Sequence, residues 1–184
     1  MNYRLGRLED LDAICQMVDF AKDLMSSQGI EQWDEIYPAK EDFKGDIEKG
    51  TLYVALEGSG ENKDENFGTH EDVASKKSSD RIVAIYVIST ECDDEYLKCT
   101  WEYEKPCILH RLCVSPDYQN KGIGKILLNK IENQLVDMGY ESCRLDVFSE
   151  NPFALKLYEK NGYERRGHAD WRKGRFYLME KKIG

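Results

Sequence analysis

Gln119-Asn120-Lys121-Gly122-Ile123-Gly124 leads directly into a predicted helix and decides how the rest of the chain is interpreted. Two glycines at the start of a helix let a ligand approach the backbone closely. The first N–H groups of a helix lack partners within it, and together with the helix dipole they bind phosphate or pyrophosphate. Lys121 and Lys125 add positive charge. The stretch matches neither the P-loop nor the full dinucleotide fingerprint, so by itself it is more typical of a tight turn.

Strands and helices alternate around this loop. A strand is predicted over residues 107–114, and the helix after the loop ends at Gly139. Its predicted apolar face holds Ile126, Leu127, Ile131, Leu135 and Met138. A strand over residues 143–148 then leads into a helix that begins at Asn151-Pro152 and ends at Asn161-Gly162. This order of elements predicts an α/β (α+β) fold with a mixed sheet.

The second of these helices carries a polar stripe. Asn151 is a good N-cap, and Pro152 occupies the first helical position, where proline is tolerated. Asn151, Ala154 and Tyr158 stand at i, i+3 and i+7, so they share one face of the helix. That face presents an amide, a small residue and a phenol to one groove. Without the glycine loop upstream, an ordinary capped helix with a packing tyrosine would explain it equally well.

The remaining segments add elements around that unit. Strands are predicted at residues 2–5, 51–56, 81–90 and 175–180, and helices at 11–26, capped by Asp10, and 40–49. We expect one domain over residues 1–184. Residues 58–80 are polar and more acidic than basic, which predicts a mobile hairpin connection, with a functional lid as the alternative. Residues 91–105 form a second acidic connection that contains aromatic side chains.

Composition excludes several classes of protein. The chain has 184 residues and a formal net charge of −9, which disfavours nucleic acid as a partner and suits either ordinary solubility or a cationic acceptor. Its longest apolar run, residues 82–88, is too short to span a membrane, and its start lacks a signal peptide's apolar stretch. The spacing of the six cysteines matches no zinc site. We therefore expect a cytoplasmic protein with reduced thiols, no metal and no membrane partner.

Taken together, these motifs resemble the GNAT superfamily of N-acetyltransferases. Residues 119–124 match the family's pyrophosphate loop, [QR]-x-x-G-x-[GA]. Arg111-Leu112-Cys113-Val114-Ser115-Pro116 resembles its coenzyme-binding strand. The spacing N-x-x-A-x-x-x-Y from Asn151 to Tyr158, followed by Asn161-Gly162-Tyr163, is similar as well. The resemblance implies a GNAT-like mixed central sheet, flanked by helices, that splays apart between the strand ending at Val114 and the strand at 143–148.

The resemblance implies acetyl-CoA as the co-substrate, bound in that gap. The residues expected to bind it are Leu112, Cys113, Val114, Gln119, Asn120, Lys121, Gly122, Ile123, Gly124, Lys125, Asn151, Ala154 and Tyr158. It also implies direct attack of a primary amine on the thioester in a ternary complex. Tyr158 then matches the family's acid for the departing thiolate, and the backbone N–H of Cys113 is the expected oxyanion donor. We interpret the Cys113 sulfur as a small hydrophobe.

His110 is the candidate base for the amine proton. It is placed two residues before Leu112, and strand alternation would put both on one face. It resembles a histidine position of arylalkylamine N-acetyltransferases, whereas the glutamate used by other members is replaced by Ile108. A structural histidine is an equally good interpretation. Glu102 and Glu104, through a bridging water, are rivals, and His70 and His168 have weaker claims.

The acceptor site is expected from the early connector and the loop before residue 107. Trp33, Glu35 and Tyr37, together with Trp101, Glu102 and Tyr103, combine aromatic faces with acids, as suits an ammonium group. We single out Trp33 as the substrate-binding residue. The acceptor is either a small-molecule amine or a peptide, and a homodimer is left open. A non-catalytic acyl-CoA sensor and a protein N-acetyltransferase are the alternative functions.

Overall fold

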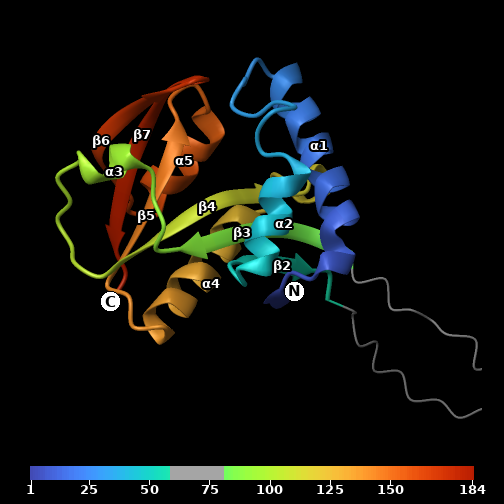
Figure 1. The fold of residues 1–184 in the computed structure, drawn as a ribbon, viewed down its shortest axis with the longest axis horizontal. Helices are drawn as coiled ribbons and strands as arrows, with labels where there is room; N and C mark the ends of the chain where they lie inside the picture. Colours follow the sequence, from blue (N-terminus) through green and yellow to red (C-terminus); the bar gives the residue numbers. More distant parts are fainter. Residues whose placement is uncertain (59–80) are drawn as a thin grey trace, which may run out of the picture.

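The computed structural model describes residues 1–58 and 81–184. Its strands form one mixed seven-stranded sheet in the order β1-β2-β3-β4-β5-β7-β6 (Figure 1). The strands are β1 (Asn2–Leu5), β2 (Leu52–Leu56), β3 (Ile82–Ser89), β4 (Pro106–Val114), β5 (Ser142–Phe148), β6 (Glu164–Trp171) and β7 (Gly174–Lys182). Only β4 and β5 pair in parallel, and the other neighbours are antiparallel. The predicted mixed sheet flanked by helices is confirmed.

Helices cover both faces of the sheet. The helices are α1 (Leu11–Ser27), α2 (Lys40–Glu48), α3 (Asp94–Leu97), α4 (Ile123–Asp137) and α5 (Pro152–Lys160), with 3-10 turns η1 (Leu8–Asp10) and η2 (Pro116–Tyr118). Apolar residues of α1 and α2 pack with β2 and β3 in one cluster. Those of α4 and α5 pack in a second cluster on the other face. Figure 1 shows α2 in front of β2–β4 and α4 behind them.

The sheet splays apart where the resemblance implied. Parallel pairing of β4 with β5 runs from Pro106↔Ser142 to Leu109↔Leu145 and goes no further along β4. Residues 110–114 therefore stay paired with β3 but not with β5. In Figure 1, β5, β7 and β6 turn away from the direction of β4. The opened edge leaves backbone N–H and C=O groups of β4 for another partner.

A bulge in β4 overturns the predicted placement of His110. Arg111 has a positive φ of 49°, and the register advances from Val87↔His110 to Ile85↔Cys113, which places one extra residue in β4. Alternation therefore changes phase at the bulge. Leu112 packs with Leu109 against the cluster of α4 and α5, whereas Ile108, on the face of His110, packs with α3. His110 does not share a face with Leu112, because simple alternation cannot see an inserted residue.

Five other points of the sequence analysis need correction. Asp10 does not cap α1 with its side chain; its carboxylate accepts hydrogen bonds from the Arg7 backbone N–H (2.7 Å) and from Arg4 (2.7 Å). The second acidic connection contains the short helix α3, and strand β6 was not predicted at all. The final strand is longer than residues 175–180, because β7 begins at Gly174. On α4, Ile126 and Met138 are exposed, and Leu128 is buried in their place.

The predicted mobile connection falls almost entirely on residues 59–80, which lie outside the described residues. On either side, the Glu57 N–H donates to the Arg81 carbonyl at 2.9 Å, so the two ends of that segment are held together. Among the described helices, none has the length and apolar character needed to cross a membrane. The single domain over residues 1–184 stays a prediction.

Candidate active site

A cleft occupies the splay between β4 and β5, and we call it the splay cleft. Its volume is about 370 Å³. It brings together nearly all the residues expected to bind the coenzyme: Leu112, Cys113, Val114, Gln119, Asn120, Gly122, Ile123, Gly124, Lys125, Asn151, Ala154 and Tyr158. Residues of α1, among them Leu24 and Met25, form the opposite wall. Lys121 is the exception; its ammonium lies 5.4 Å from the ring centroid of Tyr118 and it does not line the cleft.

The N-terminus of α4 opens onto this cleft. Gly122 caps it in the left-handed region, at φ 77°, and no heavy atom lies within 4 Å of the place where a Cβ would stand. Among the described residues no side chain caps the helix, and the Ile126 N–H donates to the Gly122 carbonyl at 3.2 Å. The N–H groups of residues 123–125 are therefore free for an anion. Open backbone, free donors and the ammonium of Lys125 fit a pyrophosphate.

Two neighbouring contacts hold this loop in place. The Gln119 side chain donates from Nε2 to the Val114 carbonyl at 2.9 Å, which ties the loop to the end of β4. Gly124 faces α5, and a Cβ built on it would stand 3.2 Å from Leu157. Close packing against the Leu157 side chain thus favours glycine at 124, whereas the left-handed backbone favours glycine at 122.

The polar stripe on α5 forms as expected. Asn151 caps the helix by accepting from the Ala154 N–H at 3.0 Å, and its Nδ2 donates to Gln32 at 2.8 Å. Tyr158 is 8% exposed and packs edge-on against Tyr163, with ring centroids 5.6 Å apart. Burial raises the pKa of Tyr158 above its usual value of 10, so the phenol stays protonated. A protonated phenol at the cleft can donate a proton.

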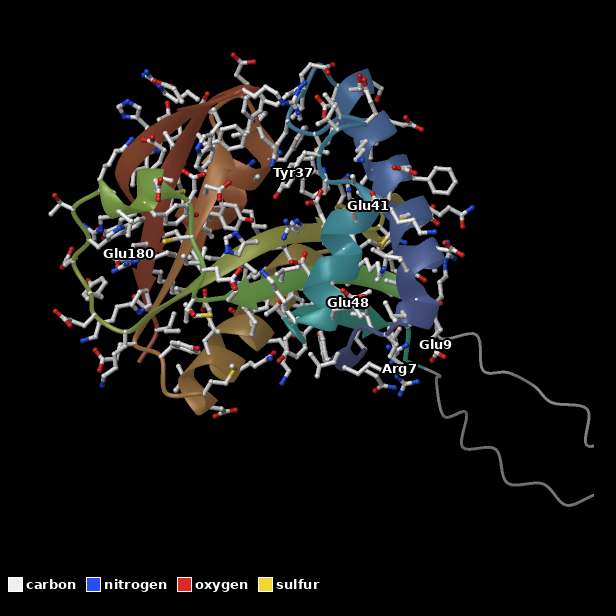
Figure 2. The ribbon with its side chains drawn as sticks, viewed as in Figure 1. Arg7, Glu9, Tyr37, Glu41, Glu48 and Glu180 are labelled. Atoms are coloured by element: carbon white, nitrogen blue, oxygen red, sulfur yellow. The ribbon has the colours of Figure 1, made fainter. Side chains whose placement is uncertain are left out.

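A second cavity, which we call the connector cavity, adjoins the first. Its volume is about 380 Å³, and its walls come from the 32–37 connector, α3, β4, β5 and the β6–β7 hairpin. Leu112, Asp146 and Tyr158 line both cavities, as do Gln32 and Trp33. Tyr37, which Figure 2 shows above β4 in that view, lines the connector cavity only. Two ligands bound in the two cavities would meet at these shared residues.

Asp146 is the important residue that sequence reasoning missed. Its carboxylate accepts from the Tyr96 hydroxyl at 2.9 Å and interacts electrostatically with His110. Burial raises the pKa of Asp146 and lowers the pKa of His110, so both groups are favoured in their neutral forms. The Nε2 of His110 lies 3.3 Å from the Glu91 carbonyl. A carboxyl within the otherwise apolar run Leu145-Asp146-Val147-Phe148 was the available signal.

The other candidates take different places. Trp33 lines both cavities, as its predicted role requires. Trp101 packs on Tyr96 instead, and Glu102 pairs with Arg166 at 2.5 Å; neither lines either cavity, nor do Glu35, Tyr103 and Glu104. His168 is exposed on β6, and His70 lies outside the described residues. Burial raises the pKa of the Cys113 thiol to about 12, which agrees with an inert sulfur.

Comparison with known proteins identifies the segment that carries these features. The Acetyltransferase (GNAT) family model matches residues 86–163. Spermidine N(1)-acetyltransferase of Thermoplasma acidophilum is 36% identical over 74 residues, which are 40% of this chain and 44% of that protein. The uncharacterized N-acetyltransferase YesJ of Bacillus subtilis is 25% identical over 180 residues, covering 95% of this chain and 86% of YesJ. The chain thus spans less than half of the spermidine enzyme it matches.

Solved structures extend the likeness to the whole fold. A structure from Staphylococcus aureus Mu50, ascribed to an acetyltransferase, superposes with a TM-score of 0.69 at 27% identity over all of both chains. The PaiA N-acetyltransferase of Thermoplasma acidophilum, solved with coenzyme A, has a TM-score of 0.64 at 20% identity and covers 98% of each chain. Within the described ranges, no group of three or more His, Cys, Asp or Glu could hold a metal ion. The segment that the GNAT family model matches, residues 86–163, thus contains the splay between β4 and β5, the open N-terminus of α4 and the polar stripe of α5.

Proposed function

We propose that this protein is an acetyl-CoA-dependent N-acetyltransferase that acetylates a primary amine by direct attack in a ternary complex. One observation carries the proposal: the splay cleft and the connector cavity meet at Leu112, Asp146 and Tyr158. A coenzyme in the first and an amine in the second would bring thioester and nucleophile to one point. Holding two reactants in this way removes much of the entropic barrier.

The residues of the splay cleft would bind acetyl-CoA through its pyrophosphate and through the amides of its pantetheine chain. The N–H groups of residues 123–125 and the Lys125 ammonium would bind the pyrophosphate. The edge of β4 at Leu112 to Val114, which β5 leaves unpaired, would pair with the pantetheine amides. Asn151 and Ala154 of α5 also line this cleft.

The chemistry then needs two proton transfers. The neutral amine attacks the thioester carbonyl, a C–N bond forms and the C–S bond breaks. His110 accepts the proton that the nitrogen loses, and Tyr158 donates one to the departing thiolate. The products are the N-acetylamine and coenzyme A with its free thiol. The Cys113 backbone N–H is the proposed donor to the carbonyl oxyanion. Burial keeps the imidazole neutral and the phenol protonated, as these roles require.

The connector cavity supports a small-molecule amine as the acceptor. Its volume of about 380 Å³ falls within the range of small-ligand sites, and Trp33 contributes to its wall where the two cavities join. The relative from Thermoplasma acidophilum acetylates spermidine by name, which supports an amine acceptor of that size. A peptide terminus that enters the same cavity is the competing acceptor.

Two measurements test the proposal. Calorimetry with acetyl-CoA should show binding, and a thiol-release assay across amines, amino acids, aminoglycosides and peptides should reveal an acceptor. Tyr158→Phe should lower turnover strongly and leave coenzyme binding unchanged. Coenzyme binding without thiol release for any acceptor, with Tyr158→Phe indistinguishable from the wild type, would instead support an acyl-CoA sensor.

A further inference from the structure

Arg111 occupies an unusual position in the wall of the connector cavity. It is the inserted residue of the β4 bulge, and its φ of 49° lies in a region that side chains other than glycine seldom adopt. Its side chain is only 16% exposed, and its guanidinium lies 5.3 Å from the ring centroid of Tyr37. A strained backbone here brings a buried cation to the side of the cavity next to His110.

The hydrogen-bonding capacity of this guanidinium is mostly unused. A guanidinium has five N–H donors in a planar fork. In the described part of the chain, Arg111 makes one hydrogen bond, from Nη1 to Asp46 at 2.8 Å, and its buried Nε has no partner. Asp46 is itself partly buried, and this burial raises its pKa despite the neighbouring cation. A buried donor without a partner is costly. The remaining N–H groups on Nη1 and Nη2 are the ones that can donate to an anionic ligand, and a guanidinium suits a carboxylate.

The wall of the cavity holds both cations and carboxyls, so an acceptor that carries an amine and an anion would find a partner for each. Three cations line it, Arg111, Arg172 and Lys173, and the carboxyls near them are Asp93 and Asp146 in the wall and the pairing partners Asp34 and Asp46. Arg172 holds both oxygens of Asp34, at 2.7 and 2.9 Å, whereas Lys173 reaches the same carboxylate only at 3.5 Å. One carboxylate therefore pairs with both cations.

The connector cavity brings a cation, a candidate base and an apolar wall together. Arg111 directly follows His110 in β4 and lines the same cavity, so its cation lies near the proposed base. Its charge also lowers the pKa of both His110 and Asp146. The rest of the wall is largely aromatic or apolar: Trp33, Tyr37, Tyr96, Leu109, Trp171 and Phe176. An acceptor that matches these walls has an amine, a neighbouring anion and an apolar group.

We propose that the acceptor is an α-amino acid with an apolar or aromatic side chain. Its carboxylate binds Arg111, its amine faces His110 and Asp146, and its side chain lies against the aromatic wall. The amine nitrogen takes the acetyl group from the thioester and loses one proton, and coenzyme A leaves as the thiol, so the products are the N-acetylamino acid and coenzyme A. This inference rests on the proposed N-acetyltransferase function and specifies its substrate.

Matched pairs of acceptors test it. Phenylalanine, leucine and methionine are each compared with the amine that lacks only the carboxylate: phenethylamine, isoamylamine and 3-(methylthio)propylamine. We expect kcat/KM to be at least tenfold higher for the amino acid in at least one pair, mainly through a lower KM, and spermidine to be poorer than that amino acid. In Arg111→Met, the ratio of kcat/KM for the amino acid to kcat/KM for its matched amine should fall close to one. Arg175→Met, which removes an exposed arginine paired with Asp170 outside both cavities, should keep it.

A binding measurement keeps the test independent of turnover. Calorimetry should show N-acetylphenylalanine binding to the protein loaded with coenzyme A, at least tenfold tighter than N-acetylphenethylamine. If Arg111→Met fails to fold, the double variant Asp46→Asn/Arg111→Met takes its place in both assays, because it leaves no unpaired carboxylate at Asp46. Equal values within every pair in both assays, or a preference for spermidine, would overturn the inference while leaving amine acetylation standing. Tight N-acetylamino acid binding without any thiol release would contradict the proposed function instead.

Discussion

The splay cleft and the connector cavity adjoin each other but are built in different ways. Most of the splay cleft comes from two short stretches, residues 112–125 and 151–158, whose motifs are visible in the sequence. The connector cavity collects side chains from at least five separate segments between Gln32 and Phe176. Backbone groups provide much of the binding capacity of the first, whereas side chains provide that of the second. A local motif therefore predicts the coenzyme site, and long-range packing determines the acceptor site.

The largest expected effect concerns the residue at the junction of the two cavities. Tyr158→Phe removes the proton donor but keeps the ring, so turnover should fall about 100-fold, within the usual range for general acid catalysis. Coenzyme affinity should change less than twofold, as calorimetry can show. Tyr163→Phe is the matched control, because Tyr163 packs against Tyr158 and lines neither cavity. A comparable loss of turnover in both variants would mean that the pair acts through packing.

The next effect should be confined to the splay cleft. Gly122→Asp adds a side chain and a negative charge beside the free N–H groups of α4, and the left-handed backbone adds strain. Acetyl-CoA should bind at least tenfold more weakly, about 1.4 kcal/mol by calorimetry.

Gly139→Asp provides the control for this change. Gly139 has a similarly positive φ of 87° and open space around it, but it lies at the far end of α4. The control should lose some thermal stability and keep its coenzyme affinity. Unchanged coenzyme affinity in a folded Gly122→Asp variant would remove the α4 N-terminus from the proposed site.

A smaller effect is expected in the pH dependence of kcat/KM, which reports on the side chains of the connector cavity. Burial lowers the pKa of His110, so the acid limb of kcat/KM should lie below the ordinary histidine value of 6.5. The Asp146 charge raises the pKa of His110, so Asp146→Asn should move that limb to lower pH. Because burial raises the pKa of Tyr158, its phenol should impose no alkaline limb below pH 10.

Acceptor amines also titrate, so the profile needs acceptors of different amine pKa. If the acid limb shifts with the amine pKa of the acceptor and persists in His110→Ala, the titrating group is the amine of the substrate. His110 would then be a structural residue of the connector cavity.

The smallest effect is expected from replacing residues 60–79, because the flanking residues Glu57, Gly58 and Arg81 line neither cavity. Residues 60–79 are polar, and the hydrogen bond from Glu57 to Arg81 already joins the ends of the segment. Replacing 60–79 with a four-residue glycine–serine turn should change the free energy of unfolding by about 1 kcal/mol or less, since loop-closure entropy depends weakly on length. Thermal and urea unfolding, with acetyl-CoA binding, measure this. A large fall in melting temperature would show that the segment contributes to the core.

Sequence periodicity predicted most elements to within one or two residues, because local signals determine them. Asn151-Pro152 begins α5 and the left-handed Gly139 follows α4, since capping and positive φ are properties of a few adjacent residues. Strand β6 was not predicted, because Glu164-Arg165-Arg166-Gly167-His168 is too polar for the usual alternation. It forms because β7 offers a complete antiparallel edge over seven pairs. Pairing with a neighbour overrode a weak local preference.

By itself, the sequence determined the family resemblance, the phosphate-binding loop and the stripe from Asn151 to Tyr158, because each depends on contacts within a few residues. Only the tertiary structure decided the surroundings of His110, because the bulge at Arg111 shifts every later side chain of β4 to the other face. It also placed Asp146 beside His110 and excluded the acidic connectors from the acceptor site. The charge that an acceptor meets is a sum over distant segments, and no local pattern contains that sum.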